Sequence, residues 1–427
     1  MATTAANKAA KILSEAVIGY AAKQPERLFL QIRGNERPRQ QARNCGGRPQ
    51  QWPQCFVVRL TGRCNLACAY CFDAANGSRR QDLDVATARQ IADYILRTPG
   101  SKPVISFFGG EPLVNWETGR FLIETLRREG RANGKIPYFN VITNGTLITP
   151  PLARELASDD ITVQISIDGP RKHHDRHRRD PSGAGSHQAA LRGLELLRAA
   201  SPKAKVDAQA VLTPGNTDLI GIAKHLKAVG FRRIKFLHLT DDEGGGEAWS
   251  AAAVRRLIRE HEKFYVYYLQ SVINGHPEVD MGFAHLIASQ PEGPHGLCTC
   301  GSDEILIDAR GDIYPCPKLY GQSAVPALGN CATSDPSAPP NISRPTQPLD
   351  SECAQCWAYE WCGGGCSFQC QKCALTPSSH SSVTQKLWCD LMRARFARAA
   401  ITYRLLRRSF PKCLESIQRL FSDVTLG

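Results

Sequence analysis

The sequence predicts an α/β protein built on a parallel sheet with helices outside, arranged as a barrel or a partial barrel and followed by a cysteine-rich segment. Between residues 55 and 239, short β-branched runs alternate six times with amphipathic stretches. Such alternation is typical of parallel sheets whose strands are joined by helices. Most of the 17 cysteines lie after residue 297. The functional groups of the barrel are therefore expected at the carboxyl ends of its strands.

The strands and helices can be placed in order along the chain. Residues 1–51 predict an appendage with a helix over 1–24, and 52–240 predict the barrel. The expected strands are 55–60, 104–108, 138–143, 162–167, 205–212 and 233–239. The clearest helices between them are 84–96, 115–129, 150–157, 186–199 and 216–229. Residues 241–297 predict a helical bridge with a long helix over 252–274, 298–395 a metal-nucleated domain with a Ser/Pro-rich insert, and 396–427 a C-terminal helix.

Composition narrows the classes of protein that the chain could belong to. With 42% hydrophobic and 22% charged residues over 427 positions, a folded core is expected and disorder as the main state is excluded. The sequence has neither an apolar run of about 18 residues nor a cleavable signal, which predicts a cytoplasmic protein without a membrane segment. The net charge of +13 favours an acidic partner. Solvated arginine-rich helices explain the same excess more simply.

Cysteine spacing is the most specific signal in the sequence. Seventeen cysteines exceed what packing needs, and in a reducing compartment they are expected to ligate metal rather than to form disulfides. Cys64, Cys68 and Cys71 directly follow the first strand with C-x3-C-x2-C spacing. Three thiolates so placed can bind one face of a cubane iron–sulfur cluster and leave one iron open. A zinc loop is the alternative, but it needs a fourth ligand and usually has C-x2-C pairs.

This motif resembles that of the radical S-adenosylmethionine (SAM) superfamily, and the resemblance extends over residues 55–240. It implies a partial (β/α)6 barrel of the radical SAM type. It also implies a [4Fe–4S] cluster whose open iron binds SAM, and reductive cleavage of SAM to a 5′-deoxyadenosyl radical. The positions that match the family's SAM contacts are Phe72, Gly109, Gly110, Glu111, Asn144, Ser166, Arg178 and Leu212.

The resemblance also gives these positions expected roles. Phe72 matches the aromatic residue whose backbone lies near adenine, and Leu212 the apolar residue that packs on it. Gly109, Gly110 and Glu111 belong to a GGEP sequence whose backbone and carboxylate approach the SAM ammonium. Ser166 and Arg178 match contacts to the ribose and to the SAM carboxylate, with Arg176 as the alternative arginine. The nearby histidines His173, His174 and His177 are expected on a surface loop that borders SAM rather than at a metal.

The C-terminal cysteines resemble those of the SPASM domain, whose members carry two auxiliary [4Fe–4S] clusters. The resemblance assigns Cys353, Cys356, Cys362 and Cys389 to the distal cluster, and Cys300, Cys316 and Cys366 to the one nearer the barrel. Cys298 is a candidate fourth ligand of the nearer cluster, which otherwise stays open to substrate. Cys370 and Cys373 repeat the C-x3-C-x2-C spacing with Cys366 and are read as spare thiols or alternative ligands. A zinc ribbon is the remaining alternative for this domain.

The resemblance implies a peptide-modifying enzyme with a precursor peptide or protein as substrate and a flavodoxin- or ferredoxin-type electron donor. The expected product is a thioether or carbon–carbon crosslink. The alternative is a sulfatase-type maturase that makes formylglycine, but those enzymes have an aspartate base where this chain has Pro317. An acid or base cannot be named from sequence, since proton-transfer geometry decides it. A third hypothesis is a non-catalytic iron–sulfur or zinc protein that serves as a scaffold for nucleic acid or partner proteins. Only the positive net charge supports it.

Overall fold

The structure is a computed structural model of the 427-residue chain. It describes residues 52–75, 81–239, 248–289, 298, 303–322, 325–338, 356–362, 365, 366, 368 and 379–422. The predicted appendage over 1–51 lies outside the described residues. So do Cys300, Cys353, Cys370 and Cys373.

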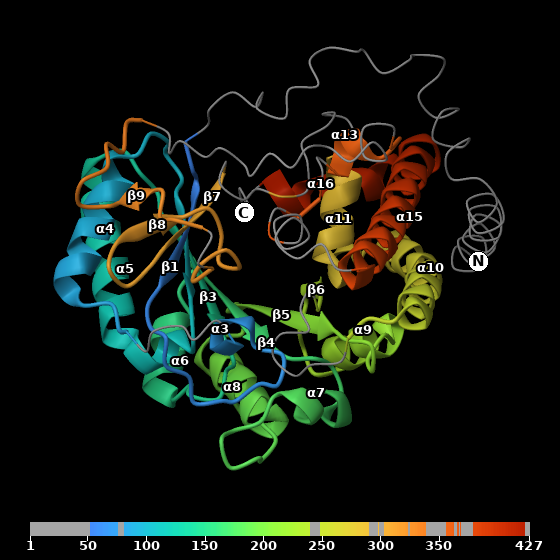
Figure 1. Ribbon diagram of the computed structural model, residues 1–427, viewed down its shortest axis with the longest axis horizontal. Helices are drawn as coiled ribbons and strands as arrows, with labels where there is room; N and C mark the ends of the chain where they lie inside the picture. The colour runs from blue at the N-terminus through green and yellow to red at the C-terminus, as the bar shows by residue number, and fades with distance from the viewer. Residues whose placement is uncertain are drawn as a thin grey trace.

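A curved sheet forms the centre of the molecule, with the strand order β6-β5-β4-β3-β2-β1-β7-β8-β9 (Figure 1). Its first six strands pair in parallel in chain order, as the alternating pattern predicted. They are β1 (Cys55–Arg59), β2 (Val104–Phe108), β3 (Tyr138–Thr143), β4 (Ile161–Ser166), β5 (Lys205–Leu212) and β6 (Ile234–His238). The strand order ends at β6 on one side, so these strands form a partial barrel.

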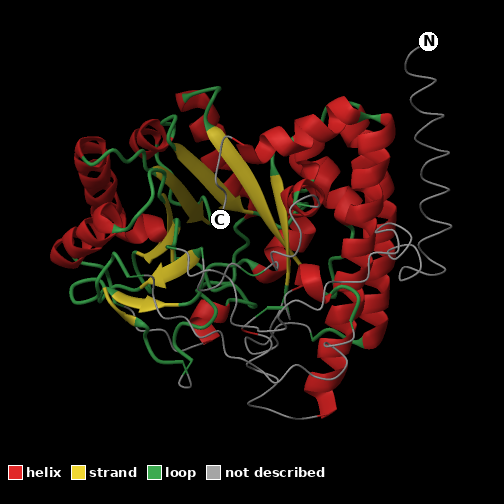
Figure 2. Ribbon diagram, turned by 90° about the horizontal axis from the view of Figure 1, so that it is seen from above, coloured by secondary structure: helices red, strands yellow, loops and turns green. Residues whose placement is uncertain are grey.

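Helices cover the outer face of the sheet, as Figure 2 shows. They are α4 (Val85–Arg97), α5 (Trp116–Ala132), α6 (Pro150–Leu156), α7 (Arg171–His177), α8 (His187–Ala200) and α9 (Leu219–Ala228), with α3 (Phe72–Ala75) and the 3-10 helix η1 (Pro112–Asn115) in the loops. Side-chain caps fix where some of them begin. Asp84 accepts a hydrogen bond from the amide of Thr87 at the start of α4, and Asp218 accepts one from Gly221 at the start of α9.

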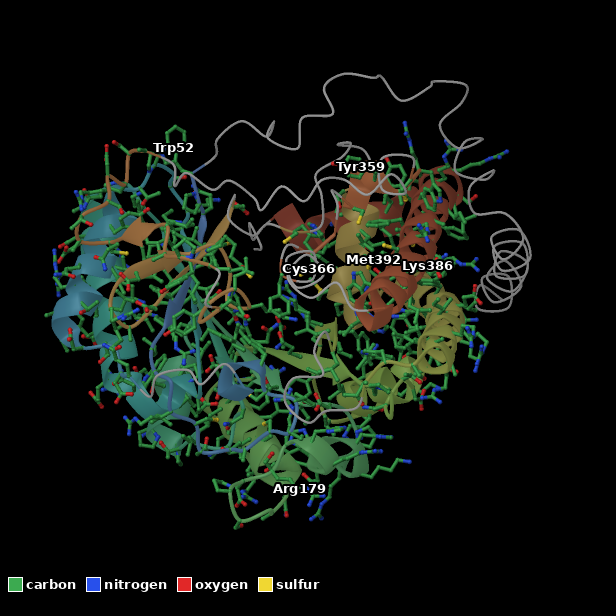
Figure 3. All side chains as sticks on the ribbon, in the orientation of Figure 1. Trp52, Arg179, Tyr359, Cys366, Lys386 and Met392 are labelled. Carbon is green, nitrogen blue, oxygen red and sulfur yellow. The ribbon has the colours of Figure 1, made fainter. Side chains whose placement is uncertain are left out.

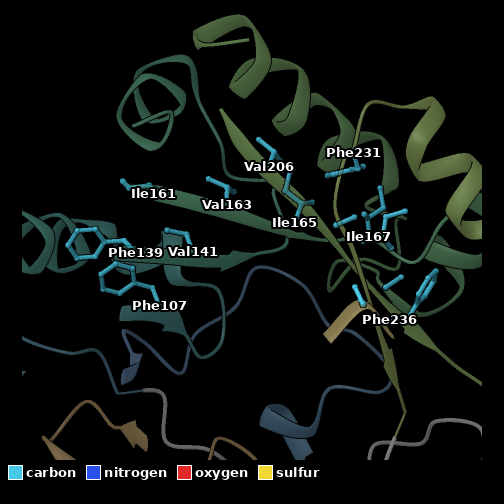
Figure 4. Close-up of a cluster of buried hydrophobic side chains, with 14 of the residues drawn as sticks. Phe107, Phe139, Val141, Ile161, Val163, Ile165, Ile167, Val206, Phe231 and Phe236 are labelled. Carbon is cyan, nitrogen blue, oxygen red and sulfur yellow. The ribbon is translucent and has the colours of Figure 1, made fainter. Parts of the chain in front are cut away.

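The two faces of the sheet differ in polarity. On the outer face, apolar side chains pack under the helices (Figure 4), among them Phe107, Phe139, Val141, Val163, Ile165 and Val206. Successive side chains of a strand point to opposite faces. The neighbours of these residues therefore face the interior, and several are polar: Ser106, Asn140, Gln164, Ser166 and Gln209. A polar interior is typical of a ligand site rather than of a packed barrel core.

The C-terminal region continues the same sheet. Strand β7 (Glu304–Ile307) pairs in parallel with β1, and β8 (Asp312–Tyr314) and β9 (Gly329–Asn330) follow as antiparallel strands. Ile305 and Ile307 of β7 belong to the main hydrophobic core. The described part of the predicted metal-nucleated domain therefore shares its core with the barrel.

Beyond β6, helices pack against one another beside the edge of the sheet (Figure 1). They are α10 (Ala251–Ile273), the 3-10 helix η2 (Pro277–Val279), α11 (Met281–Ala288), α15 (Ser379–Ser409) and α16 (Pro411–Ser422), with the short α13 (Tyr359–Cys362) before α15. The boundary predicted between residues 395 and 396 lies inside α15, and the predicted C-terminal helix is the end of α15 followed by α16. Pro411 explains the break, because proline is tolerated at a helix start but not in its interior. Among the described residues, no helix combines the length and the apolar character needed to cross a bilayer.

Candidate active site

The loop of Cys64, Cys68 and Cys71 leaves the carboxyl end of β1 and is held against the segment that follows α7. The amide of Ala67 donates to the carbonyl of Arg179 at 2.7 Å, and the amide of Ala69 donates to that of His177 at 2.9 Å. Cys64 is exposed, and the other two thiols are partly buried. The three thiols therefore lie at the end of the sheet where parallel α/β proteins place functional groups.

The surroundings of Cys64 and Cys68 disfavour free thiolates. Although Cys64 keeps exposed surface, desolvation by the protein around its thiol raises its pKa to about 12. Desolvation also raises the pKa of Cys68, with the guanidinium of Arg178 acting in the opposite direction there. A bound metal deprotonates a coordinating thiol outright. Thiolates are soft ligands that suit iron–sulfur clusters or zinc, so the chemistry of this donor set fits the cluster that the sequence predicts.

Within the described part of the chain, no three His, Cys, Asp or Glu side chains are grouped closely enough to hold one metal ion. The ligands of a four-iron cluster bind different iron atoms, so they lie further apart than the ligands of a single ion.

Glu111 joins the loops that follow β2 and β3. Its buried carboxylate accepts hydrogen bonds from the Thr143 hydroxyl at 2.6 Å, the Asn144 amide at 2.7 Å and the Leu113 amide at 3.2 Å. Burial raises the pKa of Glu111 to about 7 against these donors. The side chain of Asn144 in turn donates to Asn65 of the cysteine loop at 2.9 Å. One chain of hydrogen bonds thus aligns the ends of three neighbouring strands.

Gly109 and Gly110 allow this close approach. Both have positive φ, +93° and +46°. A Cβ atom at Gly110 would lie 2.2 Å from the carbonyl oxygen of Arg63, and one at Gly109 would lie 2.4 Å from Cγ of Arg59. Glycine is required here because the GGEP segment packs directly on β1 and on the start of the cysteine loop.

Arg178 is held inside the site by Asp168. The guanidinium donates to the two carboxylate oxygens at 3.0 and 3.2 Å, and both residues are buried. Although burial opposes ionisation, Arg178 holds the pKa of Asp168 below its usual value. The hydroxyl of Tyr70 donates to the same carboxylate, and the Tyr70 ring lies 5.3 Å from the guanidinium carbon. Arg176, the alternative arginine, is exposed.

The expectation that the three histidines lie on a surface loop is wrong, because all three lie in helix α7. The helical spacing turns His174 and His177 toward the sheet, where both are buried. His174 is a structural residue. Its Nε2 lies 2.9 Å from the Ser186 hydroxyl, and its Nδ1 accepts from the amide of Asp168 at 3.3 Å. Burial lowers its pKa to about 3, so the ring is neutral.

The remaining predicted SAM contacts lie at the same end of the sheet in different settings. Ser166 ends β4, on the inner face. Phe72 stacks on Phe108 with 6.0 Å between ring centroids. Leu212 is fully buried in the main core, on the helix side of β5. Its neighbour Val211 is partly exposed and lies on the opposite, inner face, which makes it the better placed of the two for an apolar contact with a ligand.

Several C-terminal cysteines gather in two places. Cys298, Cys316 and Cys366 pack around the small apolar cluster of Leu319 and Phe368. In the view of Figure 3, Cys366 lies between the strands and α15. Cys356 and Cys362 pack against the main core instead, and Cys389 lies on α15. The structure therefore brings together the described cysteines that were assigned to the nearer auxiliary cluster, together with the candidate fourth ligand.

Sequence reasoning missed residues that support the site, above all Tyr70, Asp73 and Asp168. Tyr70 lies between two cluster cysteines, and Asp168 follows a parallel strand directly, where polar residues usually face a site. Asp73 pairs with Arg59 and accepts from the amide of Gly110 at 3.0 Å. Their positions were visible in the sequence, but their partners were not.

Residues 58–229 match the model of the radical SAM superfamily. The chain therefore contains a radical SAM domain. Radical SAM proteins are enzymes that use SAM and a [4Fe–4S] cluster. The matched residues run from β1 into α9 and so contain the cysteine loop, the GGEP segment and the Asp168–Arg178 pair.

Two curated radical SAM relatives resemble most of the chain. A cysteine-type anaerobic sulfatase-maturating enzyme of Clostridium perfringens is 25% identical over 73% of this chain and 88% of its own length. The mycofactocin maturase MftC of Mycolicibacterium smegmatis is 27% identical over 74% of this chain and 78% of its own. Both are named as maturases.

Solved structures of radical SAM enzymes share the fold. The enzyme anSMEcpe with bound AdoMet superposes with a TM-score of 0.68 at 20% identity, covering 85% of this chain and 98% of that one. Streptococcus suis SuiB bound to its precursor peptide SuiA superposes with a TM-score of 0.55 at 20% identity. The match covers 74% of this chain and 72% of the SuiB chain.

Proposed function

We propose that this enzyme is a peptide maturase that removes a hydrogen atom from a ribosomally made precursor and installs a thioether or carbon–carbon crosslink. The names of the two maturases and the peptide bound to SuiB support a peptide substrate. In the proposal Cys64, Cys68 and Cys71 hold the SAM-binding cluster, and the bound cofactors supply the 5′-deoxyadenosyl radical. Residues of the loops after β2, β3 and β4 orient SAM.

One observation carries the proposal. The ammonium of Lys318 lies 5.8 Å from the ring centroid of Phe72 and 5.9 Å from that of Phe368. Phe72 directly follows Cys71, and Phe368 packs with Cys316 and Cys366. Lys318 therefore links the residue that follows the cysteine loop to a ring that packs with cysteines of the proposed auxiliary cluster.

This proximity suits a dehydrogenating crosslink. Such a product has two hydrogens fewer than the precursor. One leaves as a hydrogen atom, and the other leaves as a proton while its electron passes to an acceptor. Cysteines beside the radical site are well placed to hold that acceptor, and an external flavodoxin or ferredoxin would exchange electrons with the protein.

A sulfatase-type maturase is the second candidate, because one relative is named as a cysteine-type anaerobic sulfatase-maturating enzyme. Formylglycine formation also removes two hydrogens from its serine or cysteine substrate. The position after Cys316 argues against it, since Pro317 cannot accept a proton. The two products differ in chemistry, because a crosslink joins two residues whereas formylglycine carries a free aldehyde.

The test is anaerobic reconstitution with iron and sulfide, followed by SAM and dithionite. About twelve irons per chain and release of 5′-deoxyadenosine are expected for one catalytic and two auxiliary clusters. Incubation with short precursor-like peptides encoded beside the gene, read by tandem mass spectrometry, should give a crosslink that resists fragmentation between two residues. An aldehyde that reacts with a hydrazide would favour the sulfatase-type reaction instead. A filled protein that releases no deoxyadenosine would indicate a non-catalytic scaffold.

A further inference from the structure

Arg59 is a buried charge on the inner face of the barrel. Alternate residues of β1 pack on opposite sides. Phe56 and Val58 belong to the core under the helices, whereas Val57 packs with Leu306 and Tyr314 on the inner side. Arg59 follows Val57 by two positions and so faces the interior. Its side chain is 1% exposed.

Two neighbours hold the guanidinium in place. Nη1 of Arg59 pairs with the carboxylate of Asp73, whose other oxygen accepts from the amide of Gly110 at 3.0 Å. The ring of Tyr320 covers the guanidinium, with 4.8 Å between the ring centroid and the central carbon. The arginine is therefore fixed on one side by α3, which follows the cysteine loop, and on the other by the C-terminal region.

The second terminal nitrogen of Arg59 is unused. Nη2 is buried and makes no hydrogen bond with the part of the chain that the structure describes. Buried polar groups are rarely left without a partner, and the cost is largest for charged donors. A guanidinium that is held rigidly by one edge while its other nitrogen stays unsatisfied is arranged to receive an acceptor.

The surroundings favour an anionic acceptor that carries an apolar part. Phe108 lies opposite Arg59 in the strand register, Phe72 stacks on Phe108, and Lys318 lies over Phe72. Arg59 and Lys318 contribute positive charges here, beside the carboxylate of Asp73.

We propose that Nη2 of Arg59 binds a carboxylate inside the barrel. Two sources share this chemistry, an acidic group of the substrate and the amino-acid end of SAM. The first source rests on the proposed peptide function, whereas the second requires only that SAM binds.

The probe is benzoate, with benzamide as its neutral counterpart of similar shape. Binding to the reconstituted full-length protein is followed anaerobically by ligand-observed nuclear magnetic resonance. We expect benzoate to bind. Benzamide should bind at least about tenfold more weakly, because it cannot form a charge-assisted hydrogen bond with Arg59. Equal binding of the two would overturn the proposal.

The matched variant is Arg59→Gln combined with Asp73→Asn, which removes both charges together and so leaves no unpaired buried ion. Benzoate binding should weaken at least about tenfold in this variant and stay unchanged in Arg97→Gln, an exposed arginine on α4. If the double variant does not fold, Arg59→Lys keeps the charge but lacks the second nitrogen, and the same weakening is expected. Unchanged benzoate binding in the folded variant would overturn the proposal.

Saturating SAM distinguishes the two sources. Benzoate that stays bound beside SAM assigns the Arg59 site to the substrate, and benzoate that SAM displaces assigns it to the carboxylate of SAM. These measurements need no turnover. A failure of the peptide proposal would therefore leave the benzoate result intact, and the reverse also holds.

Discussion

Asp168 and Arg178 form a two-bonded ion pair inside the protein, with N–O distances of 3.0 and 3.2 Å. The same carboxylate accepts from the amide of Val211 at 3.0 Å and from the hydroxyl of Tyr70. The pair thereby ties the ends of β4 and β5 to the cysteine loop. A cluster loop anchored in this way keeps its geometry without depending on the bound cofactor alone.

Replacing Asp168 by alanine should destabilise the protein by about 3–5 kcal/mol, because Arg178 is left buried without its counter-ion. Anaerobic thermal unfolding measures the loss. Arg192→Ala on α8 is the control, since that arginine is exposed, and it should change stability by no more than about 0.5 kcal/mol. Equal melting of the two variants would remove the structural role assigned to the pair.

Glu111 should make stability depend on pH. Its folded-state pKa of about 7 lies above the usual 4.5, so the folded protein holds a proton that the unfolded chain has released. Stability from this group therefore falls as pH rises from about 4.5 through about 7. The Glu111→Gln variant lacks this titration. The side-chain nitrogen of the new glutamine would face a hydrogen-bond donor, and we expect this mismatch to lower the free energy of unfolding by about 1–3 kcal/mol. The gap in unfolding free energy between wild type and variant should narrow between about pH 5 and pH 7, and a constant gap would contradict the assignment.

Cys68→Ala should abolish formation of 5′-deoxyadenosine, because two thiols cannot hold the SAM-binding cluster. Cys413→Ala is the control, since that cysteine lies on α16, away from the cysteine loop. The assay is chromatography of the nucleoside after addition of dithionite and SAM. Cleavage of SAM by Cys68→Ala would refute the assignment of the cysteine loop.

Cys356→Ala should spare part of the SAM cleavage but lose the modified peptide. The variant is expected to contain about four irons fewer than wild type if it loses one auxiliary cluster. Iron content, deoxyadenosine and peptide mass, measured on the same sample, separate these effects. Full product yield with a normal iron content would show that Cys356 is not a required ligand.

Glu111→Ala should weaken SAM binding while the cluster stays in place. Its carboxylate accepts from Thr143, Asn144 and Leu113. This carboxylate reaches the cysteine loop only indirectly, through the side chain of Asn144, which donates to Asn65. Equilibrium dialysis against labelled SAM measures affinity, and iron analysis reports the cluster. A parallel loss of iron would mean that Glu111 supports the cluster loop as well.

The sequence was most informative where a pattern is local. The six parallel strands begin and end within about one residue of their predicted positions, because apolar alternation is a local signal. Helix caps such as Asp84 and Asp218 are local signals for the starts of helices in the same way. The cysteine loop and GGEP were recognised from fixed spacings. These are the features for which neighbouring residues alone are sufficient.

Long-range partners could not be predicted in the same way. Strand β7 has four residues, and nothing in them indicates pairing with β1. Arg59 reads as one charge at the end of an apolar strand, and only the fold reveals Asp73 and Tyr320 beside it. His174 and His177 were misplaced because a polar, charged run resembles a loop, although its helical spacing buries two of the rings.

The pairing of β1 with β7 has a consequence for biosynthesis. Cys55 lies opposite Glu304, about 250 residues later in the chain, and contacts of such separation form late in folding. While the chain emerges from the ribosome, the edge of β1 stays unpaired on that side until most of the protein has been made. An exposed strand edge is prone to aggregation. Truncation before β7 should therefore give an insoluble barrel, and production of the whole protein should benefit from slow synthesis or from chaperones.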